Sequence, residues 1–225
     1  INLIDKLIFL SLGEYEYAKK NYPKYVSKFY FLPFSVDTDF WKTDSKSSKE
    51  NKNILFIGND GKRDYEFVIE LSKKMPDFNF KFITKKIDKS KVENTNVELI
   101  SGKWDDLNIN DEQIKEYYQS SFLTIIPLIE SLQPSGQSVA LQSLMVGTPV
   151  MITRTSGFWD PKNFQNDENI IFVENNQINE WIEKINKLFE DQTSYKDLVK
   201  KGKIIVSKNY NLESFNNKLL DILST

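Results

Sequence analysis

The segment from Pro127 to Thr153 carries the residues whose types and spacing point most directly to chemistry. It reads PLIESLQPSGQSVALQSLMVGTPVMIT. The pattern predicts a buried strand, a polar loop, a small-residue turn at 134–138, an apolar helix and a second buried strand. The turn would therefore place the N-terminus of a helix beside the carboxyl end of a strand. Free backbone N–H groups and the positive end of the helix dipole at such a place favour a phosphate group.

Within this turn, Gly136 permits a close approach of the backbone, and Ser135 or Ser138 can cap the helix. We interpret the turn, with Gln137, as a cradle for a diphosphate. A well-capped core helix is the alternative, because SVALQSLMV is almost wholly apolar. Gln142 lies one helical turn after Ser138 on this apolar helix. A buried amide needs hydrogen-bond partners, which either a sugar hydroxyl or a backbone carbonyl could supply.

A second candidate site is the segment 58–64, GNDGKRD, which follows the strand pattern NILFI and opens a helical pattern. Arginine is scarce in this chain, because only Arg63 and Arg154 among 30 basic residues are arginine. An arginine retained in a lysine-rich chain indicates that a planar guanidinium is needed for bidentate hydrogen bonding. The alternative is a surface arginine paired with Asp60 or Asp64.

Glu130 is a third candidate, in the loop IESLQ between the predicted strand and the small-residue turn. Its carboxylate could accept hydrogen bonds from sugar hydroxyls, or it could be an exposed loop acid. Three aromatic residues in loops after predicted strands could form the wall of a base or sugar site, although such residues more often pack in a core. They are Trp104, Phe158 and Trp159.

Composition excludes several classes of site. The chain has no cysteine and no histidine, so disulfides, thiolate chemistry, Ser-His-Asp triads and histidine-based zinc sites are excluded. The net charge of −2 argues against nucleic-acid binding. Neither a GxxxxGK[ST] phosphate loop nor a GxGxxG dinucleotide motif is present. No apolar run approaches the ~20 residues that span a bilayer.

Short apolar runs alternate with helical patterns along the chain, which predicts an α/β fold with a doubly wound parallel sheet, Rossmann-like and covered on both faces. Ligands bind such sheets at the carboxyl ends of strands, near a topological switch point. The predicted strands are 6–11, 29–32, 53–57, 79–83, 97–100, 122–127, 150–153 and 170–173. The predicted helices are 14–20, 64–74, 111–119, 138–146, 178–190, 195–209 and 212–223.

A composition shift at residues 42–53, KTDSKSSKENKN, predicts a linker or long loop. We expect residues 1–43 to be the tail of a preceding domain with the interdomain segment, because they hold too few elements for a core. Residues 44–225 suffice for a complete Rossmann-like domain. The chain starts with Ile1, and we expect it to be a piece of a longer protein.

Taken in order, these segments resemble the C-terminal, donor-binding half of a GT-B glycosyltransferase, in the retaining family called glycosyl transferases group 1. FLPFSVDTDFWK resembles the entry to the second domain, usually written PxGVDxxxF. NILFIGNDGKRDYEFVIEL resembles the first strand–helix unit, and NVELISG the third strand. PSGQSVALQSLMVGTPVMIT resembles the signature EGFGLVxLEAMAxGxPVIAT, and GFWD with ENIIFVEN the elements after it. The resemblance covers nearly the whole chain.

The chain departs from the family pattern at several positions. The two glutamates of the signature fall on Pro134 and Gln142. The resemblance implies that Gln142 would hold the ribose and that Glu130 would replace the missing carboxylate at the donor sugar. Asn59 stands where an arginine usually follows Gly58, so that Lys62 or Arg63 would take the phosphate role.

The resemblance implies transfer of a sugar from a UDP- or GDP-linked donor to an acceptor hydroxyl, with retention of configuration. The sites implied are Glu130 and Arg63 for catalysis, and Gly58, Asn59, Lys62, Ser135, Gly136, Gln137, Ser138 and Gln142 with Arg63 for the donor. It implies no metal and no cofactor. The acceptor, a glycan, a lipid or a small molecule, would be bound mostly by a missing N-terminal domain, so the isolated chain is expected to be inactive. Cytoplasmic location, or peripheral attachment at the inner face of a membrane, is the expectation for the family.

Two other interpretations remain open. One is a degenerate, non-catalytic nucleotide-sugar-binding module, in which Pro134 and Gln142 mark lost activity. The other is a flavodoxin-like interaction domain, for which the Ser-Gly turn is only a helix cap. A crevice lined by Arg63, Gln137 and Gln142 would disfavour the second interpretation.

Overall fold

The six-stranded parallel sheet is the centre of the fold, and its strand order is β5-β4-β3-β6-β7-β8. The computed structural model describes residues 1–43, 51–101 and 109–224. It confirms the doubly wound α/β class within these ranges. The strands of the sheet are β3 Asn53–Ile57, β4 Asn79–Ile83, β5 Val97–Ile100, β6 Leu123–Ile126, β7 Val150–Thr153 and β8 Ile171–Val173.

The direction of winding reverses between β3 and β6. From β3 the chain adds β4 and β5 on one side, and it then returns to add β6, β7 and β8 on the other. The loops after β3 and β6 therefore leave neighbouring strands at the same edge of the sheet. Open α/β sheets bind their ligands at such a switch point.

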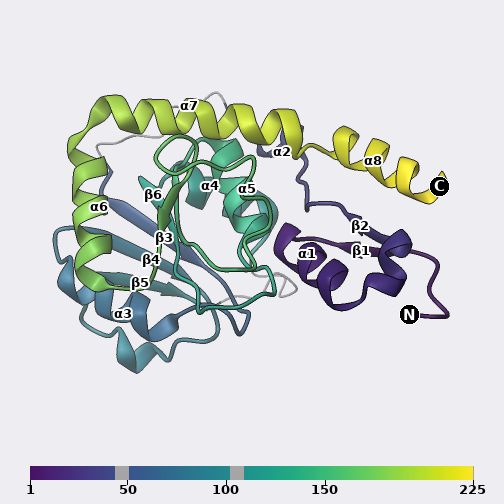
Figure 1. Cartoon of the computed structure of the whole chain (residues 1–225). Coiled ribbons are helices and arrows are strands. Elements are labelled where there is room, and N and C mark those ends of the chain that lie inside the picture. Colours follow the sequence, from purple (N-terminus) through teal and green to yellow (C-terminus); the bar gives the residue numbers. More distant parts are fainter. Residues whose placement is uncertain (44–50, 102–108, 225) are drawn as a thin grey trace.

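Helices cover both faces of this sheet (Figure 1). Helices α3 (Tyr65–Lys74) and α6 (Ile178–Glu190) contact each other on one face, whereas α4 (Asp111–Gln119) and α5 (Gln137–Val146) contact each other on the opposite face. Helix α7 (Gln192–Asn209) contacts both α6 and α5. Tyr195 and Leu198, in its first turns, pack with buried side chains of α3 and α6. Val206, farther along the helix, packs with buried side chains of α5.

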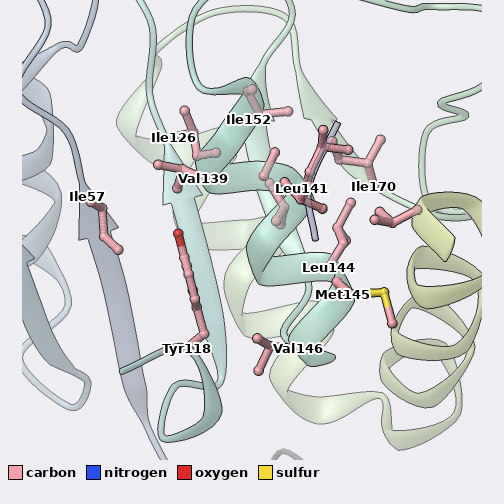
Figure 2. Close-up of a cluster of buried hydrophobic side chains, with 14 of the residues drawn as sticks. Ile57, Tyr118, Ile126, Val139, Leu141, Leu144, Met145, Val146, Ile152 and Ile170 are labelled. Atoms are coloured by element: carbon pink, nitrogen blue, oxygen red, sulfur yellow. The ribbon is translucent and has the colours of Figure 1, made fainter. Parts of the chain in front are cut away.

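The central strands are buried on both faces, which explains why their sequences are apolar without alternation. Ile54, Leu55 and Phe56 of β3 are fully buried, as are all residues of β6. Helix α5 is buried along almost its whole length. Figure 2 shows its side chains beside Ile126 and Ile152 of the neighbouring strands, with Tyr118 rising among the apolar side chains.

The N-terminal segment holds two strands and one long helix, as predicted, and two short helices that the prediction lacked. Strands β1 and β2 form a separate two-stranded parallel sheet. The elements are β1 Leu7–Phe9, α1 Leu12–Asn21, the 3-10 helix η1 Pro23–Lys28, β2 Phe29–Phe31 and α2 Thr38–Trp41. A second 3-10 helix, η2, covers Lys89–Lys91, and the last helix, α8, covers Leu212–Ser224.

Residues at the end of the N-terminal segment pack with the large sheet. Val36 and Trp41 are buried in the same apolar cluster as α5 and β6. The backbone N–H of Val36 also donates to the carbonyl of Tyr210, at 2.9 Å. Part of the predicted linker, residues 44–50, lies outside the described residues. In the part of the chain that is described, no helix is long and apolar enough to cross a membrane.

Candidate functional site

The N-terminus of α5 meets the carboxyl edge of the sheet through Gly136. This residue adopts φ of 81°, in the left-handed region that favours glycine. A Cβ atom added there would lie 2.8 Å from Cγ2 of Ile126, so the turn requires glycine sterically as well. Gly136 itself is the N-cap residue, and no side chain in the described structure caps this helix. The prediction that Ser135 or Ser138 caps the helix is therefore wrong.

Arg63 lies in the loop after β3, folded back against the strand. Its side chain is only 3% exposed, and its Nε lies 3.4 Å from the carbonyl oxygen of Ile57, to which it donates. Gly58 makes room for this conformation, because an added Cβ would lie 2.7 Å from Nε and 2.8 Å from Cγ of Arg63. The arginine is therefore a buried group at the switch point and does not lie on the surface, although it is paired with Asp60, as the alternative interpretation expected.

Backbone contacts join the loop after β3 to the loop after β6. The N–H of Asp64 donates to the carbonyl of Pro127 at 3.0 Å, and the N–H of Ile129 donates to the carbonyl of Lys62 at 2.9 Å. Between them Arg63 and Leu128 form an antiparallel bridge. These bonds hold the two loops in register across the switch point.

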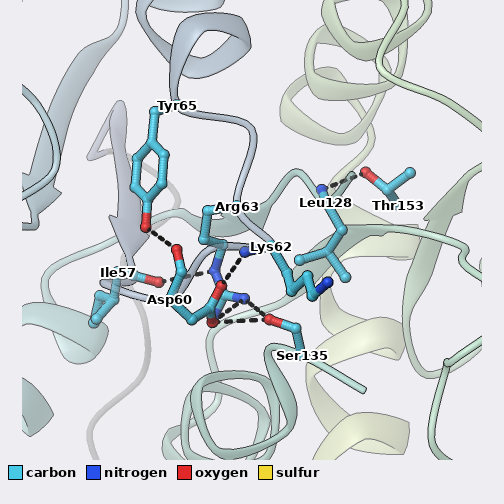
Figure 3. A network of polar contacts seen from close by, with 8 residues as sticks. All are labelled: Ile57, Asp60, Lys62, Arg63, Tyr65, Leu128, Ser135 and Thr153. Carbon is cyan, nitrogen blue, oxygen red and sulfur yellow. Dashed lines mark hydrogen bonds and ion pairs between the residues drawn. The ribbon is translucent and has the colours of Figure 1, made fainter. Parts of the chain in front are cut away.

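The two loops converge on a small polar cluster, which we call the Asp60 cluster: the side chains of Asp60, Arg63 and Ser135 and the backbone N–H of Lys62 (Figure 3). The Nη1 of Arg63 donates to the hydroxyl of Ser135 and forms an ion pair with Oδ2 of Asp60 at 3.0 Å. The Ser135 hydroxyl donates to the same Oδ2 at 2.8 Å, and the backbone N–H of Lys62 donates to Oδ1 at 2.8 Å. The structure thus brings Arg63 next to the Gly136 turn.

Burial and neighbouring charges both shift the pKa values of Arg63 and of the adjacent Tyr65. Burial lowers the pKa of the Arg63 guanidinium, and the Asp60 carboxylate opposes that shift. Burial, followed by the Asp60 charge, raises the pKa of Tyr65 to about 12, while the Arg63 charge opposes that rise. The Tyr65 hydroxyl also donates to the backbone carbonyl of Asp60 at 2.6 Å. The cluster therefore holds a buried cation beside a carboxylate.

Gln142 is buried, at 6% exposure, as its position on an apolar helix predicts. Its Oε1 accepts a hydrogen bond from the hydroxyl of Tyr118 at 3.2 Å. Burial raises the pKa of this tyrosine, so its hydroxyl remains protonated and can donate. The amide oxygen is thus satisfied by a side chain, a partner that the sequence did not indicate.

The other residues predicted around the α5 turn have separate contacts. Gln137 is buried, and its Nε2 donates to the backbone carbonyl of Leu10 at 2.9 Å, which links α5 to the N-terminal segment. Ser138 is half-buried in the first turn of α5. The carboxylate of Glu130 is exposed and accepts hydrogen bonds from the backbone N–H and the hydroxyl of Ser156. No described contact joins Arg63, Gln137 and Gln142 to one another.

Asn59 stabilises the loop after β3 from the side of β4. Its Oδ1 accepts hydrogen bonds from the Thr84 hydroxyl at 3.2 Å and from the Lys85 backbone N–H at 2.6 Å. Lys62 is half-buried and enters the Asp60 cluster through its backbone. Of these two candidates, Asn59 has a positioning role in the described contacts.

The remaining candidates either have other contacts or fall outside the described residues. Arg154 is 46% exposed, pairs with Glu174 at 3.6 Å and has its guanidinium carbon 4.2 Å from the centre of the Phe172 ring. Phe158 and Trp159 are buried and pack against each other in a tilted arrangement, with ring centres 4.0 Å apart. The packing interpretation of these two aromatic residues is confirmed. Trp104 lies outside the described residues.

Sequence reasoning missed Tyr118 in this region and did not identify the full role of Asp60. Asp60 was considered only as a partner for a surface arginine, although its position three residues before Arg63 in a strand-end loop allows both ion pairing and a turn. Tyr118 carries no local signal, because its contact with Gln142 joins residues from two different helices. Only the packing of α4 against α5 brings these two side chains together.

Comparison with known proteins gives one family and one fold. The sequence profile of the family described as Glycosyl transferases group 1 matches residues 37–205. None of the curated proteins matches the chain in sequence.

Several solved structures share the fold at low sequence identity. Sucrose-phosphate synthase from Thermosynechococcus elongatus superposes with a TM-score of 0.79 at 15% identity, covering 98% of this chain and 58% of that one. Anabaena HepE in complex with UDP and glucose gives a TM-score of 0.76 at 12% identity, covering 98% of this chain and 63% of that one. The C-terminal domain of a glycosyl transferase group 1 family protein from Francisella tularensis gives 0.61 at 18% identity, covering 79% of this chain and 99% of that domain. The chain thus spans about three fifths of the first two structures.

Proposed function

Because the chain belongs to the glycosyl transferases group 1 family, we propose that it is the donor-binding part of a retaining glycosyltransferase. The whole protein would transfer a sugar from a nucleotide diphosphate sugar to an acceptor hydroxyl. Residues 44–225, with Val36 and Trp41 packed into their core, would bind the donor. Residues 1–35 would be the end of an acceptor-binding domain that lies earlier in the polypeptide.

The contact between Arg63 and Ser135 carries this proposal. It joins the two loops of the switch point, where α/β sheets bind ligands. It also brings a guanidinium beside the first turn of α5, a helix whose N-terminus no described side chain caps. A guanidinium, a hydroxyl and free helix amides are the donors that phosphate groups prefer in proteins.

The chemistry of the proposed reaction assigns a role to these donors. Cleavage of the donor sugar develops negative charge on the β-phosphate oxygen of the leaving nucleoside diphosphate. Arg63 and the first amides of α5 would stabilise that charge. One preorganised donor of this kind commonly lowers the activation free energy by ~3–4 kcal/mol. Lys62 would add a second cation. Gly58 and Gly136 would allow this arrangement, Gly58 by making room for the Arg63 side chain.

The donor is proposed to carry UDP or GDP. UDP is supported by the solved HepE structure, which has the same fold and contains UDP and glucose. Gln142 would contact the ribose through its Nε2, since Oε1 accepts from Tyr118. Gln137 and Ser138 would flank the diphosphate, Asn59 would position the loop, and Glu130 would contact the donor sugar. We propose that the reaction needs neither a metal nor a cofactor. The proposed acceptor is a glycan, a lipid or a small molecule. The proposed location is the cytoplasm, with the protein free or attached at the inner face of a membrane.

Isothermal titration calorimetry with UDP and GDP tests the donor-binding role. Saturable heat with one of them, and no sugar transfer by the isolated chain, is the expected result. A chain that gives no heat with any nucleoside diphosphate or nucleotide sugar would contradict the proposal.

A degenerate, non-catalytic binding module is the second candidate. It is favoured by the position of Glu130, whose carboxylate bonds to Ser156, and by Pro134, which stands where the family has a glutamate. Both candidates bind the donor, so binding does not separate them. Assay of the full-length parent does: donor hydrolysis or sugar transfer supports the enzyme, and donor binding without either supports the module.

A further inference from the structure

The Asp60 carboxylate receives three hydrogen-bond donors that lie at the switch point. They are the backbone N–H of Lys62 at 2.8 Å, the hydroxyl of Ser135 at 2.8 Å and the guanidinium of Arg63 at 3.0 Å. Two come from the loop after β3 and one from the loop after β6. A backbone amide, a hydroxyl and a guanidinium around one group make an anion site.

The two charged groups of this site differ strongly in exposure. The side chain of Arg63 is 3% exposed, whereas that of Asp60 is 44% exposed. The carboxylate is therefore the solvent-facing part of the Asp60 cluster. An anion that approaches from solvent meets this carboxylate before it reaches the buried guanidinium.

We propose that Asp60 is an internal competitor for the donor diphosphate, an inference that rests on the proposed function. Without donor, its carboxylate occupies the anion site formed by Lys62, Arg63 and Ser135. The donor binds by displacing that carboxylate and taking over the same three groups. The ion pair keeps Arg63 neutralised until a phosphate of higher charge replaces it.

The competition lowers apparent affinity in a predictable way. Apparent affinity falls by the fraction of molecules whose site is free to bind. If the carboxylate occupies the site in about nine molecules of ten, the donor binds about tenfold more weakly than it would to a free site. The opposite role, in which Asp60 positions Arg63 for the donor, predicts that removing the carboxylate weakens binding. The two roles therefore differ in the sign of the effect.

Asp60→Asn is the variant that tests this competition. The amide oxygen of asparagine can still accept from the Lys62 N–H, so the turn is kept while the charge is lost. UDP and inorganic pyrophosphate are titrated by calorimetry into the wild type and into Asp60→Asn. We expect Asp60→Asn to bind both about tenfold more tightly, with an unchanged far-ultraviolet circular dichroism spectrum and a lower unfolding midpoint, because the buried Arg63 loses its accompanying anion.

Glu66→Gln is the matched control for general electrostatics. Glu66 is exposed at the start of α3 and pairs with Lys91, so this variant removes one nearby negative charge without touching the cluster. We expect less than a twofold change in affinity. A gain as large as that of Asp60→Asn would overturn the proposal, because any lost carboxylate would then suffice.

A double-mutant cycle with Arg63→Ala shows whether the gain passes through the guanidinium. We expect the Asp60→Asn gain to disappear when Arg63 is already alanine. Unchanged or weaker UDP binding by Asp60→Asn, with normal binding by the wild type, would overturn the competition and leave the proposed function intact. If only pyrophosphate binds, and more tightly to Asp60→Asn, the competition stands and the nucleotide-sugar function fails. If neither protein binds either probe, both fail.

Discussion

At the scale of single residues, Arg63 decides what the switch point can bind. The rarity of arginine in this chain marked it in the sequence, and its 3% exposure makes it a buried cation. A buried cation is costly unless an anion accompanies it. Asp60 supplies that anion in the described structure, and the proposed donor would supply it in the complex.

Replacing Arg63 by alanine is expected to weaken UDP binding by ~1.5–3 kcal/mol, because a charge-assisted hydrogen bond to phosphate is lost. Arg63→Lys should fall between wild type and alanine, since lysine keeps the charge without the planar fork. Calorimetry measures the effect. Lys201→Ala is the control, because Lys201 pairs with Glu168 just before β8, at the opposite edge of the sheet. Unchanged affinity of Arg63→Ala would remove this residue from the site.

The sequence predicted which residues of the site matter better than it predicted their partners. Gln142 was identified as a buried amide that needs a partner, and its burial is confirmed. The partner, Tyr118, could not be found, because it comes from α4 and meets Gln142 only through tertiary packing. The serines of the turn were predicted as caps, yet Ser135 bonds to Arg63 across the switch point instead. Local sequence does not encode such a contact.

At the scale of elements, the start of α5 depends on the left-handed conformation of Gly136. The chain must turn sharply from the loop after β6 into a helix that is buried along almost its whole length. Residues other than glycine rarely adopt this φ, and the neighbouring Ile126 leaves no room for a Cβ atom. The position of the proposed phosphate site is therefore set by this one turn.

Gly136→Ala is expected to destabilise the protein by ~1–3 kcal/mol through backbone strain and the contact with Ile126, and to weaken UDP binding by displacing the first turn of α5. Urea unfolding and calorimetry measure the two effects. Gly61→Ala is the matched control, since an added Cβ there meets nothing within 4 Å. A Gly136→Ala protein as stable as Gly61→Ala would show that the turn does not require glycine.

Element boundaries were predicted well where packing and local pattern agree. Strands β3, β4, β5 and β7 begin and end at the predicted residues. All four are mainly apolar, although β4 and β5 each hold one charged residue, Lys81 and Glu98. Helix α7 starts three residues earlier than predicted. Asp191 caps it by accepting from the N–H groups of Thr193 and Ser194. Helix α2 was missed because it has only four residues, too few for a periodic pattern.

At the scale of the whole molecule, the domain boundary that composition suggests differs from the one that packing suggests. The composition shift lies at residues 42–53. The shift suggested a boundary after residue 43. Val36 and Trp41 nevertheless belong to the apolar cluster of the large sheet, and the family profile begins at residue 37. Composition reports exposure to solvent along the chain, whereas a domain is defined by its shared core.

Removing residues 1–43 is therefore expected to destabilise the six-stranded unit more than removing residues 1–35. The difference should be ~3–5 kcal/mol, the usual cost of deleting a buried tryptophan side chain. Urea unfolding of both truncated proteins measures it, with Trp41→Ala in the full chain as the control that isolates one side chain. Equal stabilities of the two truncated proteins would place the boundary after residue 43, as the composition alone predicts.

The central claim is that a nucleoside diphosphate is held where the loops after β3 and β6 meet. A crystal structure of the complex with UDP tests this most directly. We predict phosphate oxygens within hydrogen-bonding distance of the Arg63 guanidinium and of the first backbone amides of α5, with the Asp60 carboxylate moved away from Ser135. A diphosphate bound at any other edge of the sheet, with the Asp60 cluster unchanged, would contradict the account.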